Sequence, residues 1–359
     1  MRPTSATIRL NAIVNNYLRA CRFAPASKTM AVIKANAYGH GLVEVARALE
    51  ADVPAYAVAF IDEAVQLRDA GISKPVLVLQ GATRAADIAE AAAKDFWLLL
   101  HDQQQIEWAV SSVSTAPVKF WLKVETGMHR LGFMPRVLDQ VCADLMSLSN
   151  VQQGPVLCTQ LACADDLNNP MTRQQLATMR SCARKYELGM SIANSAGIIS
   201  WPETHARWNR PGYMLYGNSP MESYASDSHG LSPAMSMNSE IITIKDIVAG
   251  EGIGYGLGWV AKKNTKIGTI AIGYGDGYPR HAPSGTPVLV NGQRVPLLGR
   301  VSMDLISVDL SSLEKVEVGD PVELWGQELS VNEVASAAGT IGYEILAGLT
   351  GRVPLRYQS

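Results

Sequence analysis

A lysine stands at the end of a short apolar run near the start of the chain. Residues 30–33 read Met-Ala-Val-Ile, Lys34 follows, and residues 35–41 read Ala-Asn-Ala-Tyr-Gly-His-Gly. If the run is a strand of a parallel barrel, its last side chain points into the face where the active sites of such barrels assemble. An amine that is partly shielded from water has a lowered pKa and can form a Schiff base with an aldehyde. The alternative for an isolated lysine is a side chain that lies along the surface with its charged end in water.

Short apolar runs rich in Val, Ile and Leu recur along the first two thirds of the chain, and segments with helical spacing separate most of them. Runs that are apolar on both faces and joined by helices are typical of strands in a parallel sheet. Eight such units close a (β/α)8 barrel, so we predict a TIM-type barrel, although an open doubly wound sheet would give similar local patterns. The eight runs are residues 30–34, 56–60, 76–80, 97–100, 118–124, 156–162, 190–194 and 213–216.

After about residue 230 the apolar runs follow one another without helical segments between them. Asn291 and Gly292 stand between two of these runs, and this dipeptide is typical of a two-residue hairpin turn. We therefore predict an α/β protein with a barrel over residues 1–230, a mainly β domain over residues 231–359, and a linker within residues 221–233. The predicted strands of the second domain are residues 240–247, 266–272, 287–290, 295–298, 305–310 and 321–325.

The composition is that of a globular protein with a small-molecule partner. The 359 residues suffice for a barrel and a second domain, and 47% of them are hydrophobic against 18% charged. A net charge of -2 creates no field that would gather nucleic acid or an anionic membrane. No apolar run has the length of a secretory signal or a membrane span, so we expect a cytoplasmic protein. The five cysteines lack metal-binding spacing, and we expect reduced structural thiols and no metal.

Motifs rich in glycine and in reactive side chains follow one another along nearly the whole chain. The set comprises Val-Ile-Lys-Ala-Asn-Ala-Tyr-Gly-His-Gly at 32–41, Lys123, Glu-Thr-Gly-Met-His-Arg-Leu-Gly-Phe at 125–133, Asn-Ser-Ala at 194–196, Arg-Pro-Gly at 210–212, Gly-Tyr-Gly at 254–256, Gly-Tyr-Gly-Asp-Gly at 273–277 and Gly-Arg-Val-Ser-Met-Asp at 299–304. One such motif would be weak, but the ordered set resembles that of bacterial alanine racemases, and of their catabolic members most of all. The resemblance implies an isomerase that interconverts L-alanine and D-alanine with pyridoxal 5'-phosphate (PLP) as cofactor.

The resemblance assigns the two catalytic bases. It implies that Lys34 binds PLP covalently and acts on one face of the substrate, and that Tyr255 of the partner subunit acts on the other face. Racemisation needs this arrangement, because a proton must leave Cα from one side and return from the opposite side. The shared site implies a homodimer. Judged without the resemblance, Tyr255 would be an aromatic residue in a turn of the β domain.

Further positions match the cofactor-binding residues of the family. Tyr38, Ser195, Gly212 and Tyr213 correspond to its phosphate-binding residues, and hydroxyls with backbone N–H groups near glycine can approach a dianion closely. Arg210 corresponds to the residue that faces the pyridine nitrogen. Because arginine keeps its proton, that nitrogen would stay unprotonated and a long-lived carbanion would be disfavoured.

The resemblance also implies a substrate site. Arg130 would bind the substrate carboxylate through its fork of donors, and the backbone at Met303 would make a second contact. Lys123 matches a lysine that is often carbamylated in these enzymes and then orients the arginine, the alternative being a plain lysine at the barrel rim. The positions that match the substrate entryway are Asp165, Tyr274, Arg280 and Arg300.

Two positions depart from the family pattern. Gln160 stands where the family usually has a histidine stacked on the pyridine ring, and glutamine can neither stack as an imidazole nor titrate near neutral pH. We expect an altered network between Arg210 and Tyr255 and an altered pH optimum. Gly351 stands where some members have a tyrosine that touches the phosphate, which suggests looser selectivity for small side chains.

Three other functions are compatible with parts of the sequence. Gln160 and Gly351 leave room for a racemase of broader specificity. A PLP-dependent amino-acid decarboxylase of the same architecture would place a catalytic cysteine in its C-terminal domain, but the last cysteine of this chain is Cys182. A non-catalytic PLP-binding protein of the single-barrel type would lack the second domain altogether.

Overall fold

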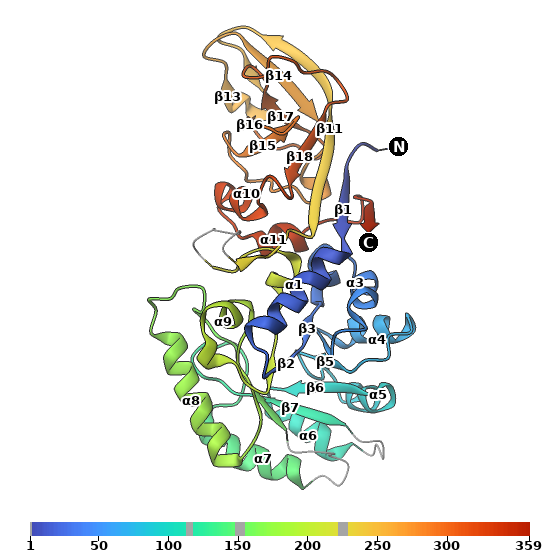
Figure 1. Ribbon diagram of the computed structural model, residues 1–359, viewed down its shortest axis with the longest axis vertical. Coiled ribbons are helices and arrows are strands. Elements are labelled where there is room, and N and C mark those ends of the chain that lie inside the picture. Colours follow the sequence, from blue (N-terminus) through green and yellow to red (C-terminus); the bar gives the residue numbers. More distant parts are fainter. Residues whose placement is uncertain (1, 113–117, 148–154, 222–228) are drawn as a thin grey trace.

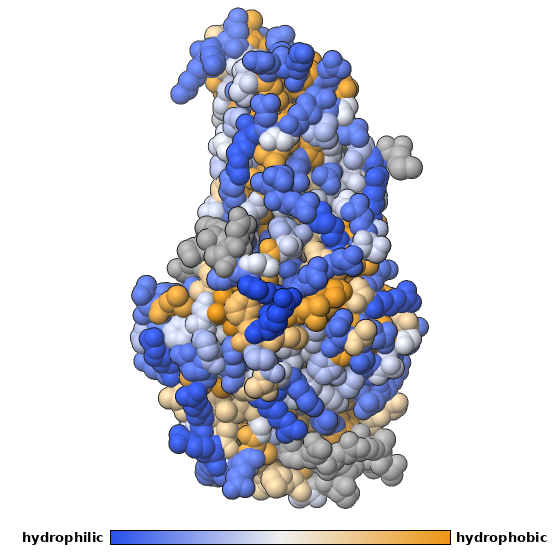
Figure 2. Space-filling view, in the orientation of Figure 1, coloured by the Kyte–Doolittle hydropathy of each residue, from blue (hydrophilic) through white to orange (hydrophobic). Residues whose placement is uncertain are grey.

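The computed structural model describes residues 2–112, 118–147, 155–221 and 229–359. The chain forms a barrel of strands and helices and a second body built mainly of strands, and the short helix α11 (Gly342–Ala347) lies where the two meet (Figure 1). Polar side chains cover much of both bodies, and apolar side chains gather at the level of the junction (Figure 2). In the part of the chain that the structure describes, no helix is both long and apolar enough to cross a membrane.

The strands of the first body run parallel and close on themselves. In the described residues their order is β2, β10, β9, β8, β7, β6, β5, β4, β3, and β2 and β3 are separated along the chain by Met30 alone. The two ends of the sheet therefore meet, and the predicted TIM-type barrel is confirmed. The strand bounds are β2 (Lys28–Thr29), β3 (Ala31–Val32), β4 (Tyr56–Val58), β5 (Val76–Val78), β6 (Phe96–Leu100), β7 (Lys119–Lys123), β8 (Val156–Cys158), β9 (Met190–Ser191) and β10 (Trp208–Asn209).

Alternation along the strands divides the barrel residues between two cores. Leu77, Trp97 and Trp121 belong to a cluster inside the barrel, whereas Val76 and Leu98 pack in the large core shared with the helices. Both faces are buried, which explains the near-continuous apolar runs. The surrounding helices are α1 (Leu10–Phe23), α3 (Leu42–Leu49), α4 (Ile61–Asp69), α5 (Ala86–Lys94), α6 (Gln103–Ser111), α7 (Leu138–Met146), α8 (Met171–Tyr186) and α9 (Ser195–Ser200).

One predicted strand is wrong. Residues 213–216 form the 3-10 helix η3 (Tyr213–Tyr216), and the last strand of the barrel is β10, which is only two residues long. All four residues of η3 are buried, so their apolar run cannot be told from a buried strand by periodicity alone. The five cysteines are free, and Cys142, Cys158 and Cys182 are buried, as expected for structural thiols.

The second body is mainly β, as predicted. Strands β11, β18, β15, β16, β17 and β14 form a sheet that closes through the pairing of β14 with β11. Asn291 and Gly292 connect β15 to β16, and their φ values of 51° and 73° fit the predicted two-residue hairpin turn. The elements are β11 (Met235–Ile247), β12 (Gly252–Ile253), β13 (Trp259–Val260), β14 (Thr265–Ile270), β15 (Pro287–Val290), β16 (Gln293–Leu298), β17 (Ile306–Asp309), β18 (Pro321–Trp325), α10 (Val331–Ala338) and α11.

Both ends of the chain join the second body. Strand β1 (Ser5–Arg9) pairs antiparallel with β11 and parallel with β19 (Leu355–Gln358), and the chain then enters the barrel through α1 (Figure 1). The predicted division at residue 230 stays a prediction. Residues 222–228 of the predicted linker lie outside the described residues.

Candidate active site

Lys34 begins a turn with an unusual backbone. It is the first residue of the element α2 (Lys34–Gly39), in which Ala35, Asn36, Ala37 and Tyr38 all have φ values between 52° and 54°. Such left-handed residues cost about 1–2 kcal/mol each when they carry a side chain. A turn of this kind persists only where the surroundings hold it, and it is typical of functional sites.

Hydrogen bonds hold the turn from both sides. Within it, Ala37 N donates to Ile33 O at 2.9 Å, and Leu42 N donates to Asn36 Oδ1 at 2.8 Å. From the next barrel unit, Glu63 Oε1 accepts a hydrogen bond from Ala35 N at 2.6 Å, and Glu63 Oε2 accepts one from Ala59 N at 2.7 Å. Glu63 therefore ties the Lys34 turn to the segment that follows β4.

The turn opens on a cavity at the C-terminal ends of the barrel strands. Lys34 follows β3, Lys123 ends β7, Gln160 follows β8 and Arg210 follows β10. The structure thus brings together side chains that lie far apart in the sequence. The predicted site residues that line this cavity are Lys34, Tyr38, Lys123, Arg130, Gln160, Ser195, Arg210, Gly212 and Tyr213.

Burial and positive neighbours favour the neutral form of Lys34. Burial lowers the pKa of its amine, Arg130 and Arg210 lower it further, and the carboxylate of Glu63 opposes them. A neutral amine is the form that attacks an aldehyde, so this environment suits Schiff-base formation.

Lys123 lies in a similar environment on the barrel wall. Burial lowers the pKa of its amine to about 8, with Arg210 and Arg130 acting in the same direction and Cys158 and Glu125 against it. A substantial fraction of Lys123 is therefore neutral in mildly alkaline solution, and neutral amines are the form that reacts with carbon dioxide.

Neutral oxygen atoms hold the guanidinium of Arg210 in place. Its Nη1 donates to Ser191 Oγ at 2.5 Å, and its Nη2 donates to Thr159 O at 2.6 Å and to Gln160 Oε1 at 3.3 Å. Arg210 is buried, so these bonds fix both its position and its charge beneath the cavity. Gln160 is therefore a direct neighbour of Arg210.

A small cradle lies beside Tyr38. Ser195 Oγ accepts hydrogen bonds from Gly212 N at 3.0 Å and Met214 N at 3.3 Å, and a Cβ atom at Gly212 would stand 2.7 Å from Tyr38 Oη. Only glycine fits at this position without moving the tyrosine. Burial raises the pKa of Tyr38 to about 12, so its hydroxyl keeps its proton and can donate to an anion at neutral pH.

Tyr343 also lines the cavity, although no motif in the sequence indicates it. It comes from α11 of the other body, and its ring stacks on that of Tyr213 with centroids 3.7 Å apart and planes 10° apart. Gly351 is exposed, and a Cβ atom there would have nothing within 4 Å. Tyr343 supplies a tyrosine to this side of the cavity, so the looser selectivity inferred from Gly351 loses its basis.

Comparisons with known proteins agree along the whole chain. The family model described as "Alanine racemase, N-terminal domain" matches residues 8–220, and the model described as "Alanine racemase, C-terminal domain" matches residues 234–357. The chain belongs to the alanine racemase family.

Individual relatives in this family match over their full length. The chain is 45% identical over 357 residues to the biosynthetic alanine racemase of Pseudomonas aeruginosa, covering 99% of each sequence, and 46% identical over 354 residues to an alanine racemase of Marinobacter nauticus, covering 98% of each. The crystal structure of the Pseudomonas aeruginosa biosynthetic enzyme superposes with a TM-score of 0.97 at 45% identity and covers 100% of both chains. The alanine racemase of Acinetobacter baumannii superposes with a TM-score of 0.94 at 36% identity, again over 100% of both chains. The stronger resemblance to catabolic members of the family stays a prediction, since the Pseudomonas aeruginosa relative is named a biosynthetic enzyme.

Five residues that the alanine racemase resemblance assigned to the site do not line the cavity of Lys34 in the described chain. They lie in the second body, where Tyr255 is 73% exposed and the Arg300 guanidinium packs against Gly256. Asp165 lines an adjoining hollow that shares Arg130, Gln160, Tyr213 and Tyr343 with the cavity. The five residues outside both are Tyr255, Tyr274, Arg280, Arg300 and Met303.

Proposed function

We propose that this protein is a PLP-dependent alanine racemase that interconverts L-alanine and D-alanine by a two-base mechanism. The observation that carries the proposal is the convergence of Lys34, Tyr38, Arg130 and Arg210 on one cavity, in a chain 45% identical to an alanine racemase over its whole length. Two of these residues are cations suited to a carboxylate and a ring nitrogen, one is a hydroxyl donor, and one is an amine with a lowered pKa.

The residues at the cavity fit PLP. An aldehyde needs a neutral amine, which Lys34 offers, and a phosphate ester needs hydroxyl and backbone donors in a narrow space. The hydroxyls of Tyr38 and Ser195 would provide such donors, with Gly212 and Tyr213 beside them, and a Cβ atom at Gly212 would stand 2.7 Å from Tyr38 Oη. Arg210 would face the pyridine nitrogen, with Gln160 as its neighbour. When bound, PLP supplies an electron-withdrawing ring that stabilises negative charge at the substrate Cα.

Two opposed groups would move the proton. Lys34 Nζ takes or gives the proton on one face of Cα, and Tyr255 Oη of the partner subunit does so on the other. The lowered pKa of Lys34 favours the neutral amine, which is the form that acts as a base. Arginine at position 210 keeps its proton and would leave the pyridine nitrogen unprotonated, so the bound group would stabilise negative charge at the substrate Cα only weakly.

A homodimer would complete the site. Tyr255, Leu257 and Met303 are exposed by 73%, 62% and 52% in the single chain, so their side chains are free to contact a second copy. Pairing two copies about a two-fold axis would place this surface of each copy over the cavity of the other. Tyr274, Arg280 and Arg300 would then line the substrate entryway together with Asp165.

The substrate carboxylate would bind between Arg130 and the backbone at Met303 of the partner subunit. Carbamylation of Lys123 would support this contact. Carbon dioxide adds to the neutral Nζ, a proton leaves to solvent, and the amine becomes a carbamate anion. The change replaces repulsion from Arg130 and Arg210 by attraction, because these two guanidiniums lower the pKa of the unmodified amine.

The remaining assignments extend the same proposal. We expect the barrel to span residues 1–230 and the β domain residues 231–359, and we place the protein in the cytoplasm. A racemase of broader specificity remains the alternative that Gln160 favours, since the position beneath the ring departs from the family pattern.

Racemisation by the purified protein tests the proposal. With PLP present, L-alanine should lose its optical rotation and D-alanine should appear, and Lys34→Ala should reduce the rate by about 10³-fold or more. Lys119→Ala is the matched control, because Lys119 lies at the opposite end of the barrel on β7. A panel of amino acids distinguishes the broader racemase, and release of carbon dioxide would identify a decarboxylase. Unchanged optical rotation in the wild-type protein would overturn the proposal.

A further inference from the structure

A buried carboxylate lies next to the loops that carry Tyr274 and Met303. Asp276 is 0% exposed and ends the 3-10 helix η6 (Tyr274–Asp276). Its Oδ2 accepts a hydrogen bond from Gly273 N at 3.1 Å, which closes the turn on itself. A buried carboxylate needs opposite charge close by, because burial otherwise disfavours its ionised form.

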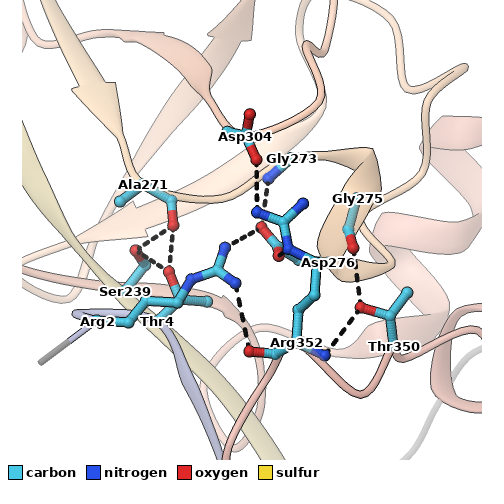
Figure 3. A network of polar contacts seen from close by, with 10 residues as sticks. All are labelled: Arg2, Thr4, Ser239, Ala271, Gly273, Gly275, Asp276, Asp304, Thr350 and Arg352. Atoms are coloured by element: carbon cyan, nitrogen blue, oxygen red, sulfur yellow. Dashed lines mark hydrogen bonds and ion pairs between the residues drawn. The ribbon is translucent and has the colours of Figure 1, made fainter.

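Two arginines from opposite ends of the chain provide that charge (Figure 3). Arg2 Nη2 lies 2.5 Å from Asp276 Oδ2, and Arg352 Nε lies 3.5 Å from Asp276 Oδ1. Arg352 Nη2 in turn contacts Asp304 Oδ1 at 2.6 Å, and Arg2 Nη1 donates to Arg352 O at 3.3 Å. We call Arg2, Asp276, Asp304 and Arg352 the Asp276 cluster.

The cluster is continuous with the backbone of both loops. Tyr274 N donates to Ser302 O at 3.0 Å, and Gly275 N donates to Met303 O at 2.9 Å. Thr350 Oγ1 donates to Gly275 O at 2.8 Å from the segment that also carries Arg352. The ion pairs therefore fix a unit made of residues 273–277, residues 302–304 and the two ends of the chain.

The start of the chain is anchored beside this unit. The Thr4 hydroxyl donates to the carbonyl of Ala271, just before the Tyr274 turn, and lies 3.1 Å from the Ser239 hydroxyl (Figure 3). Thr4 is fully buried and β1 begins at the next residue. Arg2 is thus held close to Asp276 by its own segment, and its guanidinium is 27% exposed.

We propose that the Asp276 cluster positions the Tyr274 and Met303 loops for the active site of the partner subunit, so that a residue near the start of the chain governs substrate binding there. This inference rests on the proposed function, because it takes Tyr274 and the Met303 backbone to face the partner's substrate. The members of the cluster are positioning residues. If the two loops are loosened, a smaller fraction of the protein is able to bind alanine, and the apparent affinity for alanine falls by that fraction. The rate of the chemical step stays nearly unchanged.

The test uses full-length holoenzyme without an N-terminal tag. Arg2→Ala should raise KM for alanine about fivefold or more with kcat within about twofold, and Arg2→Lys should restore much of the affinity because a cation returns to Asp276. Asp276→Asn should act in the same direction. The matched control is Arg294→Ala, which removes an exposed arginine of β16 that pairs with Glu333 of α10.

Hydrogen exchange gives a second readout that does not depend on turnover. In Arg2→Ala, amides of residues 273–277 and 302–304 should exchange faster, while those of β15 and β16 keep their wild-type rates. Unchanged exchange in these loops, or an unchanged KM in an active Arg2→Ala protein, would overturn the inference. Failure of the wild-type protein to racemise alanine would instead overturn the proposed function, and the exchange rates would still test the cluster.

Discussion

Arg210 donates a hydrogen bond of 3.3 Å from Nη2 to Gln160 Oε1 beneath the Lys34 cavity. Gln160 is held from its other side, since its backbone carbonyl accepts a hydrogen bond of 2.8 Å from Gln175 Nε2. The position that the family usually fills with a titratable ring is therefore occupied by a fixed, neutral amide. The charge of the network beside Arg210 should not change with pH near neutrality.

Gln160→His should introduce a new titration into the pH profile of kcat/KM. An imidazole has an unperturbed pKa of about 6.5, and the adjacent guanidinium of Arg210 should lower the value by disfavouring the charged ring. The variant should show an inflection on the acidic side of neutrality that the wild-type protein lacks. Steady-state rates from about pH 5 to 9 measure it, and profiles of identical shape would contradict the role assigned to Gln160.

Two substitutions of Glu63 should distinguish the effect of its charge on Lys34 from the effect of its hydrogen bonds on the Lys34 turn. Glu63→Ala removes the acceptor of Ala35 N, and the strained turn should lose about 1–3 kcal/mol of unfolding free energy. Glu63→Gln keeps one acceptor oxygen but loses the second of the two that accept from Ala35 N and Ala59 N, so its loss of stability should be smaller than that of the Ala variant. It also removes a carboxylate that raises the pKa of Lys34, so that pKa should fall. The rate of PLP binding to the apo-protein should then rise at lower pH than in the wild-type. A Gln variant as unstable as the Ala variant would argue against this separation.

The Lys123 amine should be carbamylated by carbon dioxide to an extent that increases with pH. Its pKa is lowered to about 8, so the fraction of Lys123 in the reactive neutral form rises as the pH passes through that value and becomes small below it. Protein incubated with ¹³C-labelled bicarbonate should show a carbamate carbon in its NMR spectrum at pH 8.5 or so. Lys123→Arg is the control and should show no such signal. A wild-type spectrum without it would contradict the modification.

Gly212→Ala should weaken cofactor binding. The added Cβ would stand 2.7 Å from Tyr38 Oη and must displace the ring, at a cost of about 1–3 kcal/mol. We expect PLP to bind about tenfold or more weakly, measured by titrating the apo-protein. Gly351→Ala is the matched control, because a Cβ there meets nothing within 4 Å, and its PLP affinity should equal that of the wild-type. Equal affinities for both variants would contradict the cradle.

The barrel and much of its site could be predicted because both follow from local signals. Strands buried on two faces leave apolar runs, and the end of such a run lies at the face where barrel sites form, as Lys34 does in the structure. The hairpin turn at Asn291 and Gly292 likewise follows from the types of these two residues alone.

Long-range relationships left no such trace in the sequence. Strand β10 has only two residues, so the more apolar residues 213–216 were mistaken for the last strand. Ala35 and Ala37 give no sign of a left-handed turn, because alanine disfavours it and only contacts such as that with Glu63 maintain it. Tyr343 reaches the cavity from the other body, which no spacing within the barrel could indicate.

The central claim is that one site combines Lys34 of one subunit with Tyr255 of its partner. Co-expression of differently tagged Lys34→Ala and Tyr255→Phe chains, each inactive alone, yields a heterodimer that tests it directly. In a shared arrangement one site of the heterodimer carries both substitutions and the other carries neither, so the purified heterodimer should regain about half of the wild-type kcat per dimer. If both residues served the same chain's site, each site would be defective. A pure heterodimer without activity would contradict the account.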